Sequence, residues 1–323
     1  MLKSKLQIYL VSYNRKKKLQ ETLNTILADS SPVKNFDITI LDNASTDGSS
    51  ELIKEYCAKY KNLKHTRHSV NIGGTANISR AFELGASCGK EYFWILCDDD
   101  KYDFSNWVEV EDVINKGEDV ICVADYAFEK DKDKSSAAHQ IFQLTFVPAG
   151  IYKSELIGND VLINMYDGLH TILQQVCVAM KCVNSKKNIY VLKKPIVFNG
   201  CFFEDKVDDE SLSYTRGADD NWILSRKRNT SWVLGFSGVI TLLKDANLRK
   251  KCLEVSIPSK YIYGSWEYFY KQTYRNYFSF ANLNYFYELF VALPAKRRLG
   301  LASYFFVYII KQFFGLFKSK RKA

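Results

Sequence analysis

The sequence predicts an α/β fold in which a mostly parallel central sheet is flanked by helices. Short apolar runs alternate with amphipathic segments throughout the first 128 residues. The apolar runs are continuous, as in strands that are buried on both faces of a parallel sheet. Polar residues gather where several of these runs end, which is where ligands bind in sheets of this kind.

The expected elements follow one another along the chain. Strands are expected at residues 6–12, 36–42, 62–68, 92–97 and 119–128, and helices at 15–28, 47–60, 73–87 and 107–115. The second half is less regular, with a charged loop expected at 129–140, a helix at 162–183, a strand at 188–198, a long acidic loop at 199–217 and mostly helical structure from residue 218 onward. Long loops in compact enzymes are often active-site lids, and we expect the acidic loop to be one.

The net charge of +9 is not spread evenly over the 323 residues. Residues 244–323 carry 15 Lys and Arg against 4 Asp and Glu, so the positive charge belongs to the C-terminal segment. A nucleic-acid-binding protein more often spreads its positive charge over the folded domain, so we expect no nucleic-acid partner. The N-terminus lacks the pattern of a secretory signal, and the eight scattered cysteines lack zinc-site spacing, so we expect a cytoplasmic protein with reduced cysteines.

The densest negative charge of the chain lies at Asp98, Asp99 and Asp100, directly after the apolar run at 92–97. Carboxylate oxygens are preferred ligands of Mn²⁺ and Mg²⁺, which can bridge the phosphates of a nucleotide. The alternative interpretation is a solvated helix N-terminus, where acidic residues are also favourable. The first turn, SYNRKKKL, has no glycine and the chain has no P-loop, so a metal held by carboxylates is the expected means of neutralising a diphosphate.

Four stretches resemble, in order and spacing, the family 2 glycosyltransferases. They are YLVSYNR at 9–15, ITILDNASTDGS at 38–49, NIGG at 71–74 and FWILCDDD at 93–100. The resemblance covers roughly residues 5–105 and implies the GT-A nucleotide-diphospho-sugar transferase fold. It also implies a metal-dependent, inverting transfer of a sugar from a nucleotide donor.

The resemblance implies a role for each matching residue. The implied nucleotide-sugar-binding residues are Ser12, Tyr13, Asp42, Asn71, Gly73, Arg80, Asp98 and Asp99. Asp42 would hydrogen-bond the base, typically uracil, and Ser12 and Tyr13 would line the same pocket. Asp98 and Asp100 would bind Mn²⁺ or Mg²⁺, with Asp100 as the principal ligand.

The chain departs from the family pattern at three positions. Val11 replaces the usual proline, Ala44 replaces a glycine, and Ser79 stands where asparagine is common. The third departure leaves two interpretations of Arg80 open, a phosphate-binding residue and an exposed helix residue.

The catalytic base is expected in the stretch RGADDNWILSRKR at 216–228, which resembles the family's acidic motif at the start of a helix. Asp219 is the best match and Asp220 the second. Ordinary helix capping is the alternative interpretation of both residues. The acidic residues of the preceding loop are further candidates for the base, and they are Glu204, Asp205, Asp208 and Asp209.

The aromatic and basic segment at 244–323 is expected to be a helical extension beyond a catalytic domain at 1–243. That domain would comprise a nucleotide-binding half at 1–128 and an acceptor half at 129–243. Residues 299–310 form an uncharged run of 12, shorter than the roughly 20 apolar residues that span a bilayer. A helix lying on an anionic membrane surface is expected, with a true span or an aromatic core as alternatives.

The expected function is therefore sugar transfer from a nucleotide donor, typically a UDP-sugar, to a glycan or lipid-linked acceptor in surface polysaccharide assembly. The expected location is the inner face of the cell membrane, with the protein attached peripherally. Two alternatives stay open at the level of the sequence: a sugar nucleotidyltransferase, and a membrane-associated binding protein on a degenerate transferase fold.

Overall fold

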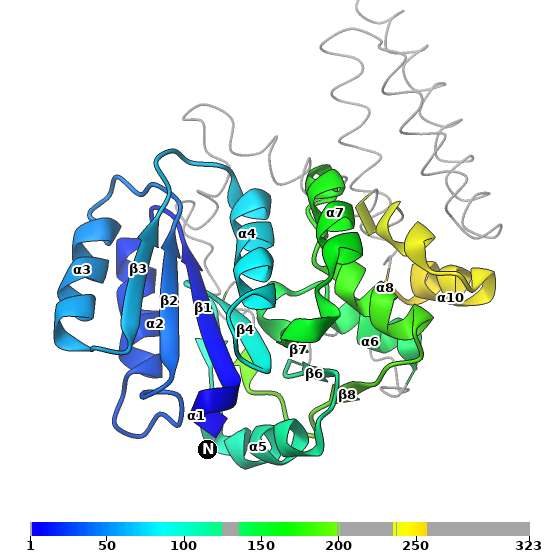
Figure 1. The fold of residues 1–323 in the computed structure, drawn as a ribbon, viewed down its shortest axis with the longest axis horizontal. Helices are drawn as coiled ribbons and strands as arrows, with labels where there is room; N and C mark the ends of the chain where they lie inside the picture. Colours follow the sequence, from blue (N-terminus) through cyan, green and yellow to red (C-terminus); the bar gives the residue numbers. More distant parts are fainter. Residues whose placement is uncertain (1, 125–135, 199, 201–234, 237, 257–323) are drawn as a thin grey trace, which may run out of the picture.

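The computed structural model describes residues 2–124, 136–198, 200, 235–236 and 238–256. Within these ranges a seven-stranded sheet has the order β3-β2-β1-β4-β7-β6-β8 (Figure 1). Its strands are β1 (Leu6–Ser12), β2 (Asp37–Asp42), β3 (Leu63–Arg67), β4 (Tyr92–Cys97), β6 (Val120–Cys122), β7 (Gly150–Lys153) and β8 (Ile189–Val191). A second sheet pairs β5 (Lys101–Tyr102) with β9 (Val197–Phe198) in antiparallel orientation.

The four strands β3, β2, β1 and β4 run parallel to one another, which confirms the prediction of a mostly parallel sheet. The register between β1 and β2 pairs Ser12 with Asp42, and the register between β1 and β4 pairs Val11 with Cys97. The carboxyl ends of these three strands therefore lie side by side. The strand β7 was not expected from the sequence, and it is antiparallel to both β4 and β6.

The helices connect these strands and cover both faces of the sheet (Figure 1). They are α1 (Leu2–Lys5), α2 (Lys16–Ile26), α3 (Ser49–Lys59), α4 (Gly74–Ala86), α5 (Trp107–Lys116), α6 (Ala137–Gln143), α7 (Asn159–Asp167), α8 (Val176–Asn184) and α10 (Ala246–Ser256), with short 3₁₀ turns at Phe104–Asn106, Val147–Ala149, Ser154–Leu156, Leu169–Thr171 and Ile240–Leu242. The connections β1-α2-β2 and β2-α3-β3 each place the next strand nearer the β3 edge of the sheet. The connection β3-α4-β4 runs in the opposite direction, because β4 lies on the other side of β1. Because such crossovers are right-handed, α2 and α3 lie on one face and α4 on the other.

Three expectations for the second half are wrong. The single helix expected at 162–183 is two helices, α7 and α8, because the chain turns between them at Gly168 and at Ile172, whose φ of 56° lies in the left-handed region. The strand expected at 188–198 is two short strands in different sheets, β8 and β9. The loop expected at 129–140 already contains the start of α6, where Ser136 Oγ accepts a hydrogen bond from His139 N.

The core between α4 and the sheet is aromatic. Phe82 on α4 meets Phe93 on β4 edge to face, with ring centroids 5.5 Å apart, and Phe93 stacks on Tyr152 of β7 at 5.6 Å. Gly85 lets α4 approach this cluster, because a Cβ at that position would lie 2.5 Å from the Phe93 ring. The contact fixes α4 on β4, and with it the loop that enters α4 beside the strand ends.

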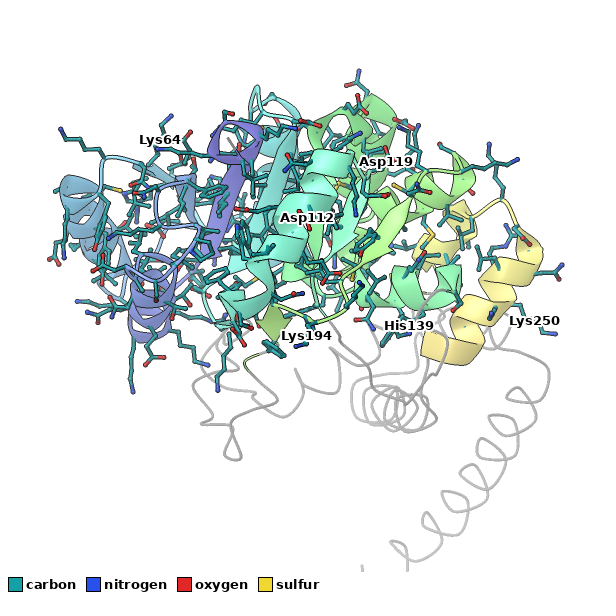
Figure 2. The ribbon with its side chains drawn as sticks, turned by 90° about the horizontal axis from the view of Figure 1, so that it is seen from below. Lys64, Asp112, Asp119, His139, Lys194 and Lys250 are labelled. Atoms are coloured by element: carbon teal, nitrogen blue, oxygen red, sulfur yellow. The ribbon has the colours of Figure 1, made fainter. Side chains whose placement is uncertain are left out.

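The helix α10 packs against α6 at the end of the molecule away from β3, where Figure 2 labels His139 on α6 and Lys250 on α10. Cys252 and Leu253 of α10 are buried in the same core as the sheet. No helix in the described part of the chain is long and apolar enough to cross a membrane. The rest of the expected C-terminal extension lies outside the described residues.

Candidate functional site

Three strand ends meet at one place in the sheet. Ser12 ends β1, Asp42 ends β2, and Asp98 follows the last residue of β4. Ser12 Oγ donates a hydrogen bond of 2.7 Å to Asp98 Oδ2, and Ser12 O accepts one of 3.0 Å from Asn43 N. The convergence that the sequence predicted is therefore present in the structure.

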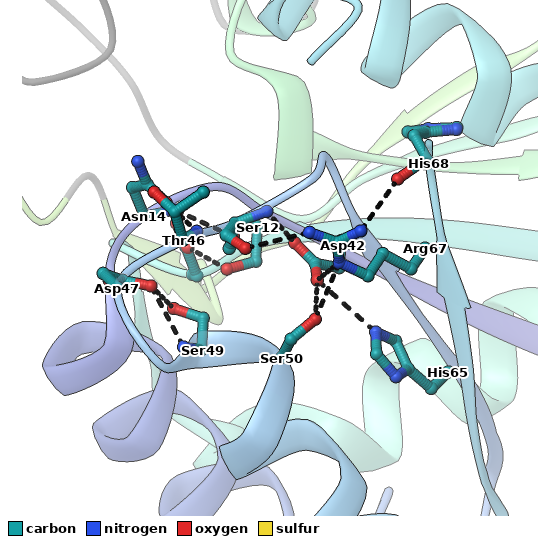
Figure 3. Close-up of polar contacts among 12 residues, drawn as sticks. Ser12, Asn14, Asp42, Thr46, Asp47, Ser49, Ser50, His65, Arg67 and His68 are labelled. Carbon is teal, nitrogen blue, oxygen red and sulfur yellow. Dashed lines mark hydrogen bonds and ion pairs between the residues drawn. The ribbon is translucent and has the colours of Figure 1, made fainter. Parts of the chain in front are cut away.

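The Asp42 carboxylate is fully buried and is surrounded by hydrogen-bond donors (Figure 3). Its Oδ1 accepts from Ser45 N at 2.8 Å, and its Oδ2 accepts from Ser50 Oγ. His65 Nε2 and Arg67 Nε lie 3.5 and 3.3 Å from the same Oδ2. Burial tends to raise the pKa of Asp42, but the contacts with His65, Ser50 and Ser45 outweigh it and hold the pKa well below its ordinary value. Asp42 is therefore a charged residue that organises the turn after β2.

The turns after β1 and β2 are joined by hydrogen bonds. Asn14 N donates to Ser45 Oγ at 3.0 Å, and Thr46 N donates to Asn14 Oδ1 at 2.7 Å. Asn14 and Ala44 both have positive φ values, 48° and 64°. Because this region of backbone conformation disfavours side chains with a Cβ, the glycine that is usual at position 44 in the resembling family has a physical reason.

Arg15 supplies the positive charge beside the three consecutive carboxylates at 98–100, which we call the carboxylate turn. Its Nη1 lies 3.1 Å from Asp98 Oδ1 and 2.5 Å from Asp99 Oδ2, and the side chains of Arg15 and Asp98 are both buried. Thr22 Oγ1 on α2 donates to Asp98 O at 3.0 Å. Burial raises the pKa of Asp98 to about 6, against the opposing effect of Arg15. Both Asp98 oxygens thus have partners within the protein, and Asp98 ties β4 to β1 and α2.

The donor atoms that gather at the other side of the carboxylate turn belong to Cys97, Asp99 and Asp100. The Cys97 Sγ and one oxygen of each carboxylate lie within 4.8 Å of one another, the single group of this kind in the part of the chain that the structure describes. Asp98 lies outside this group, although the sequence predicted it as a metal ligand with Asp100. Burial, together with the neighbouring Asp99 carboxylate, raises the pKa of Asp100 well above its ordinary value. A divalent cation would offset the repulsion between these carboxylates, so the donor set fits Mn²⁺ or Mg²⁺.

Gly200 holds the carboxylate turn from the far side of the small sheet. Gly200 N donates to Asp100 Oδ1 at 3.2 Å, two residues after β9 pairs with β5. A Cβ at Gly200 would lie 1.9 Å from Asp99 O, so the close approach requires glycine. The chain therefore enters the expected acidic loop directly from a contact with the carboxylate turn.

The loop before α4 is tied to the end of β2. Asn43 Nδ2 donates to Asn71 Oδ1 at 2.7 Å, and Gly73 N donates to the same oxygen at 2.8 Å. Ile72 N in turn donates to Asn43 Oδ1 at 3.0 Å. Gly73 has a φ of 87°, which favours glycine at the position that leads into α4. Two predicted residues, Asn71 and Gly73, are thus placed beside Asp42 by way of Asn43.

Two other predicted residues are placed differently. Tyr13 follows Ser12 at the end of β1 and is partly exposed, next to the strand ends. Arg80 forms an ion pair with Glu83 one turn along α4, and Tyr166 OH of α7 donates to the same glutamate at 2.8 Å. The side chain of Arg80 is 40% exposed. This geometry favours the interpretation of Arg80 as an exposed helix residue.

The predicted catalytic residues Asp219 and Asp220 lie outside the described residues, as do the further acidic candidates at 204–209. Sequence reasoning assigned no role to Arg15, Cys97 or Gly200. Arg15 had a usable signal, because it follows a strand that neighbours β4 and the carboxylate turn requires a positive group. Cys97 stands inside the quoted stretch FWILCDDD but had no pattern of metal-ligand spacing around it.

Comparisons with known proteins agree with this geometry. A family model described as Glycosyl transferase family 2 matches residues 7–182, more than half of the chain. Abequosyltransferase RfbV of Salmonella typhimurium is 37% identical over 90 residues, which are 28% of this chain and 26% of that protein. A poly(ribitol-phosphate) beta-glucosyltransferase of Bacillus spizizenii is 30% identical over 70 residues, which are 22% of this chain and 11% of that protein. Both matches thus span well under two thirds of the relative.

Solved structures share the fold at low sequence identity. Residues 1–349 of S. aureus TarS superpose with a TM-score of 0.55 at 15% identity, over 92% of this chain and 83% of that one. The mannosyltransferase PcManGT of Pyrobaculum calidifontis, solved with GDP-Man and Mn²⁺, gives a TM-score of 0.53 at 13% identity over the same shares. With the extent of the family match, these findings show that the chain is an enzyme of glycosyltransferase family 2 with the GT-A fold.

Proposed function

We propose that this glycosyltransferase is metal-dependent and inverting, and that it transfers a sugar from a nucleotide-diphosphate donor to a glycan or lipid-linked acceptor. The observation that carries the proposal is the meeting of Ser12, Asp42 and the carboxylate turn at the carboxyl ends of three parallel strands. Ligands of open α/β sheets bind at this edge. The carboxylates of Asp99 and Asp100 lie at this edge, where a cation held by them would meet the diphosphate of the donor.

A UDP-sugar is the proposed donor. S. aureus TarS 1–349 has been solved with UDP-GlcNAc and superposes with a TM-score of 0.51 at 15% identity, and PcManGT has been solved with GDP-Man. The proposed donor pocket comprises Ser12, Tyr13, Asp42, Asn71, Gly73, Asp98 and Asp99. Both carboxylate oxygens of Asp42 already accept hydrogen bonds within the protein. Asp42 would therefore contribute to binding of the uracil base by holding the turn at 43–50 in place. Arg80 would contribute to the diphosphate site only after leaving Glu83.

Asp99 and Asp100 would hold the divalent cation, and Asp98 would hold the turn in place through Ser12 and Arg15. When bound, Mn²⁺ or Mg²⁺ supplies positive charge to a leaving nucleoside diphosphate. Arg15 neutralises part of the carboxylate charge but is buried, so it cannot replace the cation at the diphosphate.

Asp219 is the proposed base, with Asp220 as second candidate. Inverting transfer requires a carboxylate that removes the proton of the acceptor hydroxyl as the bond to the sugar forms. Either residue would act from the acceptor half expected at 129–243.

We also propose that the segment at 244–323 attaches the catalytic domain to the inner face of a membrane, where a lipid-linked acceptor in surface polysaccharide assembly would be presented. Its excess of Lys and Arg and its many Tyr and Phe residues support this proposal. Sedimentation of the full chain with anionic and with neutral vesicles tests it. We expect cosedimentation with the anionic vesicles that is lost at high salt, and equal binding to neutral vesicles would contradict the electrostatic part of the proposal.

Calorimetric titration of the full chain with UDP, with and without Mn²⁺, tests the donor and the metal together. We expect UDP binding that depends on Mn²⁺ and is lost in Asp100→Ala, while Asp112→Ala on the exposed side of α5 binds as the unchanged protein does. UDP binding that is independent of metal would contradict metal dependence. Metal-dependent binding of GDP in place of UDP would contradict only the proposed uracil nucleotide of the donor and would leave metal dependence standing.

A further inference from the structure

Cys97 has an unusual position for a cysteine of this chain. It is the last residue of β4 and directly precedes the carboxylate turn, whereas Cys122, Cys177, Cys182 and Cys252 are buried in the core. Its backbone is fixed by Tyr102, whose hydroxyl accepts from Cys97 N at 3.0 Å and donates to Cys97 O at 2.8 Å. The side chain of Cys97 is partly exposed. Cys97 therefore packs against the apolar core at a defined place but is not among its fully buried residues.

The neighbours of the Cys97 thiol are the carboxylates of Asp99 and Asp100. The Cys97 Sγ and one oxygen each of Asp99 and Asp100 lie within 4.8 Å of one another. No hydrogen bond to the Cys97 sulfur occurs among the described residues. In zinc sites, metal–sulfur and metal–oxygen distances are about 2.3 and 2.0–2.2 Å, so one cation can contact three donors at this spacing after small side-chain rotations.

The charges around this group also favour a cation. Asp98, Asp99 and Asp100 bring three carboxylates to one turn, and Arg15 pairs with Asp98 and with one oxygen of Asp99. Asp100 instead accepts a hydrogen bond from a neutral group, Gly200 N. The carboxylates of Asp99 and Asp100 are therefore the groups beside the Cys97 sulfur, and a cation bound there would offset the repulsion between them.

We propose that Cys97 is a metal ligand together with Asp99 and Asp100, so that the cation of the donor site is held by a mixed set of one sulfur and two carboxylates. The inference rests on the proposed function, because it concerns the same cation. Carboxylates alone suit Mg²⁺ and Mn²⁺, whereas a thiolate favours softer ions such as Zn²⁺ and Co²⁺. The site should therefore bind Co²⁺ and Zn²⁺ at least 10-fold more tightly than Mg²⁺, and Cys97→Ser should reduce this preference.

Titration of the full chain with Co²⁺ in the presence of UDP tests the proposal, because a thiolate bound to Co²⁺ gives a charge-transfer absorption in the near ultraviolet. We expect this band in the unchanged protein and in Cys57→Ser, a matched control on α3 that is also partly exposed. In Cys97→Ser we expect the band to be lost while calorimetry still detects Co²⁺ binding, weakened by about 10-fold. Retained near-ultraviolet circular dichroism would show that this variant is folded.

The other outcomes separate the inference from the proposed function. Binding of Co²⁺ by the unchanged protein without the band would overturn the role of Cys97 and leave the metal-dependent transferase standing. A band that persists in Cys97→Ser would assign the sulfur ligand to another cysteine and overturn the inference. Failure of the unchanged protein to bind Mg²⁺, Mn²⁺ or Co²⁺ would overturn both.

Discussion

The guanidinium of Arg15 lies between two carboxylates of the carboxylate turn, with Nη1 3.1 Å from Asp98 Oδ1 and 2.5 Å from Asp99 Oδ2. Arg15 precedes the first residue of α2, and its carbonyl accepts the hydrogen bond from Leu19 N that begins the helix. One residue therefore links the end of β1, the start of α2 and the acidic end of β4. The arrangement explains how three consecutive carboxylates are tolerated after a buried strand.

Replacing Arg15 with Met should strongly destabilise the protein. The change leaves Asp98 buried, with Ser12 as its remaining side-chain partner, and breaking a buried ion pair by removing one partner costs about 3–5 kcal/mol. Arg15→Lys should lower the free energy of unfolding by less than Arg15→Met, because the positive charge remains. The free energy of unfolding in urea at pH 7 measures both changes.

The matched control for Arg15 is Lys17→Met on the exposed side of α2. Exposed substitutions of this kind usually change stability by less than about 0.5 kcal/mol. Equal losses in the Arg15 and Lys17 variants would contradict the role of the buried ion pair.

Gly200→Ala should weaken metal-dependent nucleotide binding without unfolding the domain. The added Cβ would lie 1.9 Å from Asp99 O, so the carboxylate turn or the segment after β9 must shift. A shift of Asp100 relative to Asp99 would reduce the affinity for UDP in the presence of Mn²⁺ by about 10-fold, which is about 1.4 kcal/mol. Calorimetric titration with UDP and Mn²⁺ measures the change.

Gly238→Ala is the control for Gly200, because an added Cβ there meets no atom within 4 Å. Its affinity for UDP should stay within about 2-fold of the unchanged protein, a difference of about 0.4 kcal/mol. If Gly200→Ala also binds as the unchanged protein does, then the contact between Gly200 and the carboxylate turn does not set the metal site.

The sheet in the first half could be predicted because the residues within and next to each strand indicate that the strand is buried and where it ends. The runs that became β1, β2 and β4 are mostly apolar, and each ends at or just before polar residues. Parallel neighbours then bring their carboxyl ends together, which placed Ser12, Asp42 and Asp98 correctly. Periodicity was sufficient here because each element is bounded by its own turn residues.

The same reasoning failed where structure depends on contacts distant in sequence. Four consecutive cations begin at Arg15, and although the carboxylates after β4 call for a positive group, periodicity alone does not say which of the four turns inward to meet them. The break between α7 and α8 depends on the backbone at Ile172, a residue type that rarely adopts a positive φ. The strand β7 has four residues and forms because β4 and β6 on either side supply its hydrogen bonds.

Ala44→Gly should stabilise the protein. Ala44 has a φ of 64°, and the left-handed conformation costs a residue with a Cβ about 1–2 kcal/mol. Glycine relieves that cost but loses more entropy on folding, so a net gain of about 0.5–1 kcal/mol is expected. Denaturant unfolding measures it, with Ala58→Gly in α3 as a control that should change stability in the opposite direction. Equal signs for the two substitutions would show that the backbone at Ala44 is not strained.

The stabilising effect of Asp42 should depend on pH. The contacts of Asp42 lower its pKa below the value of 3.8 that it has in the unfolded chain. The unfolded chain then binds more protons than the folded protein at acidic pH, so stability rises with pH in that range. The contribution is fully present above the unfolded pKa and is lost as the pH falls through the lowered pKa of the folded state.

Asp42→Asn tests this dependence, because the asparagine keeps the shape of the side chain but not its charge. The free energy of unfolding in urea should fall by about 1–3 kcal/mol at pH 7, since the variant leaves hydrogen-bond donors facing a weaker acceptor. The difference between the variant and the unchanged protein should stay constant from pH 7 to 5.5 and shrink at pH 4.5 and 3.5. Asp112→Asn on the exposed face of α5 should show no such trend, and a difference for Asp42→Asn that grows toward acid would mean that its carboxylate is not stabilised in the folded protein.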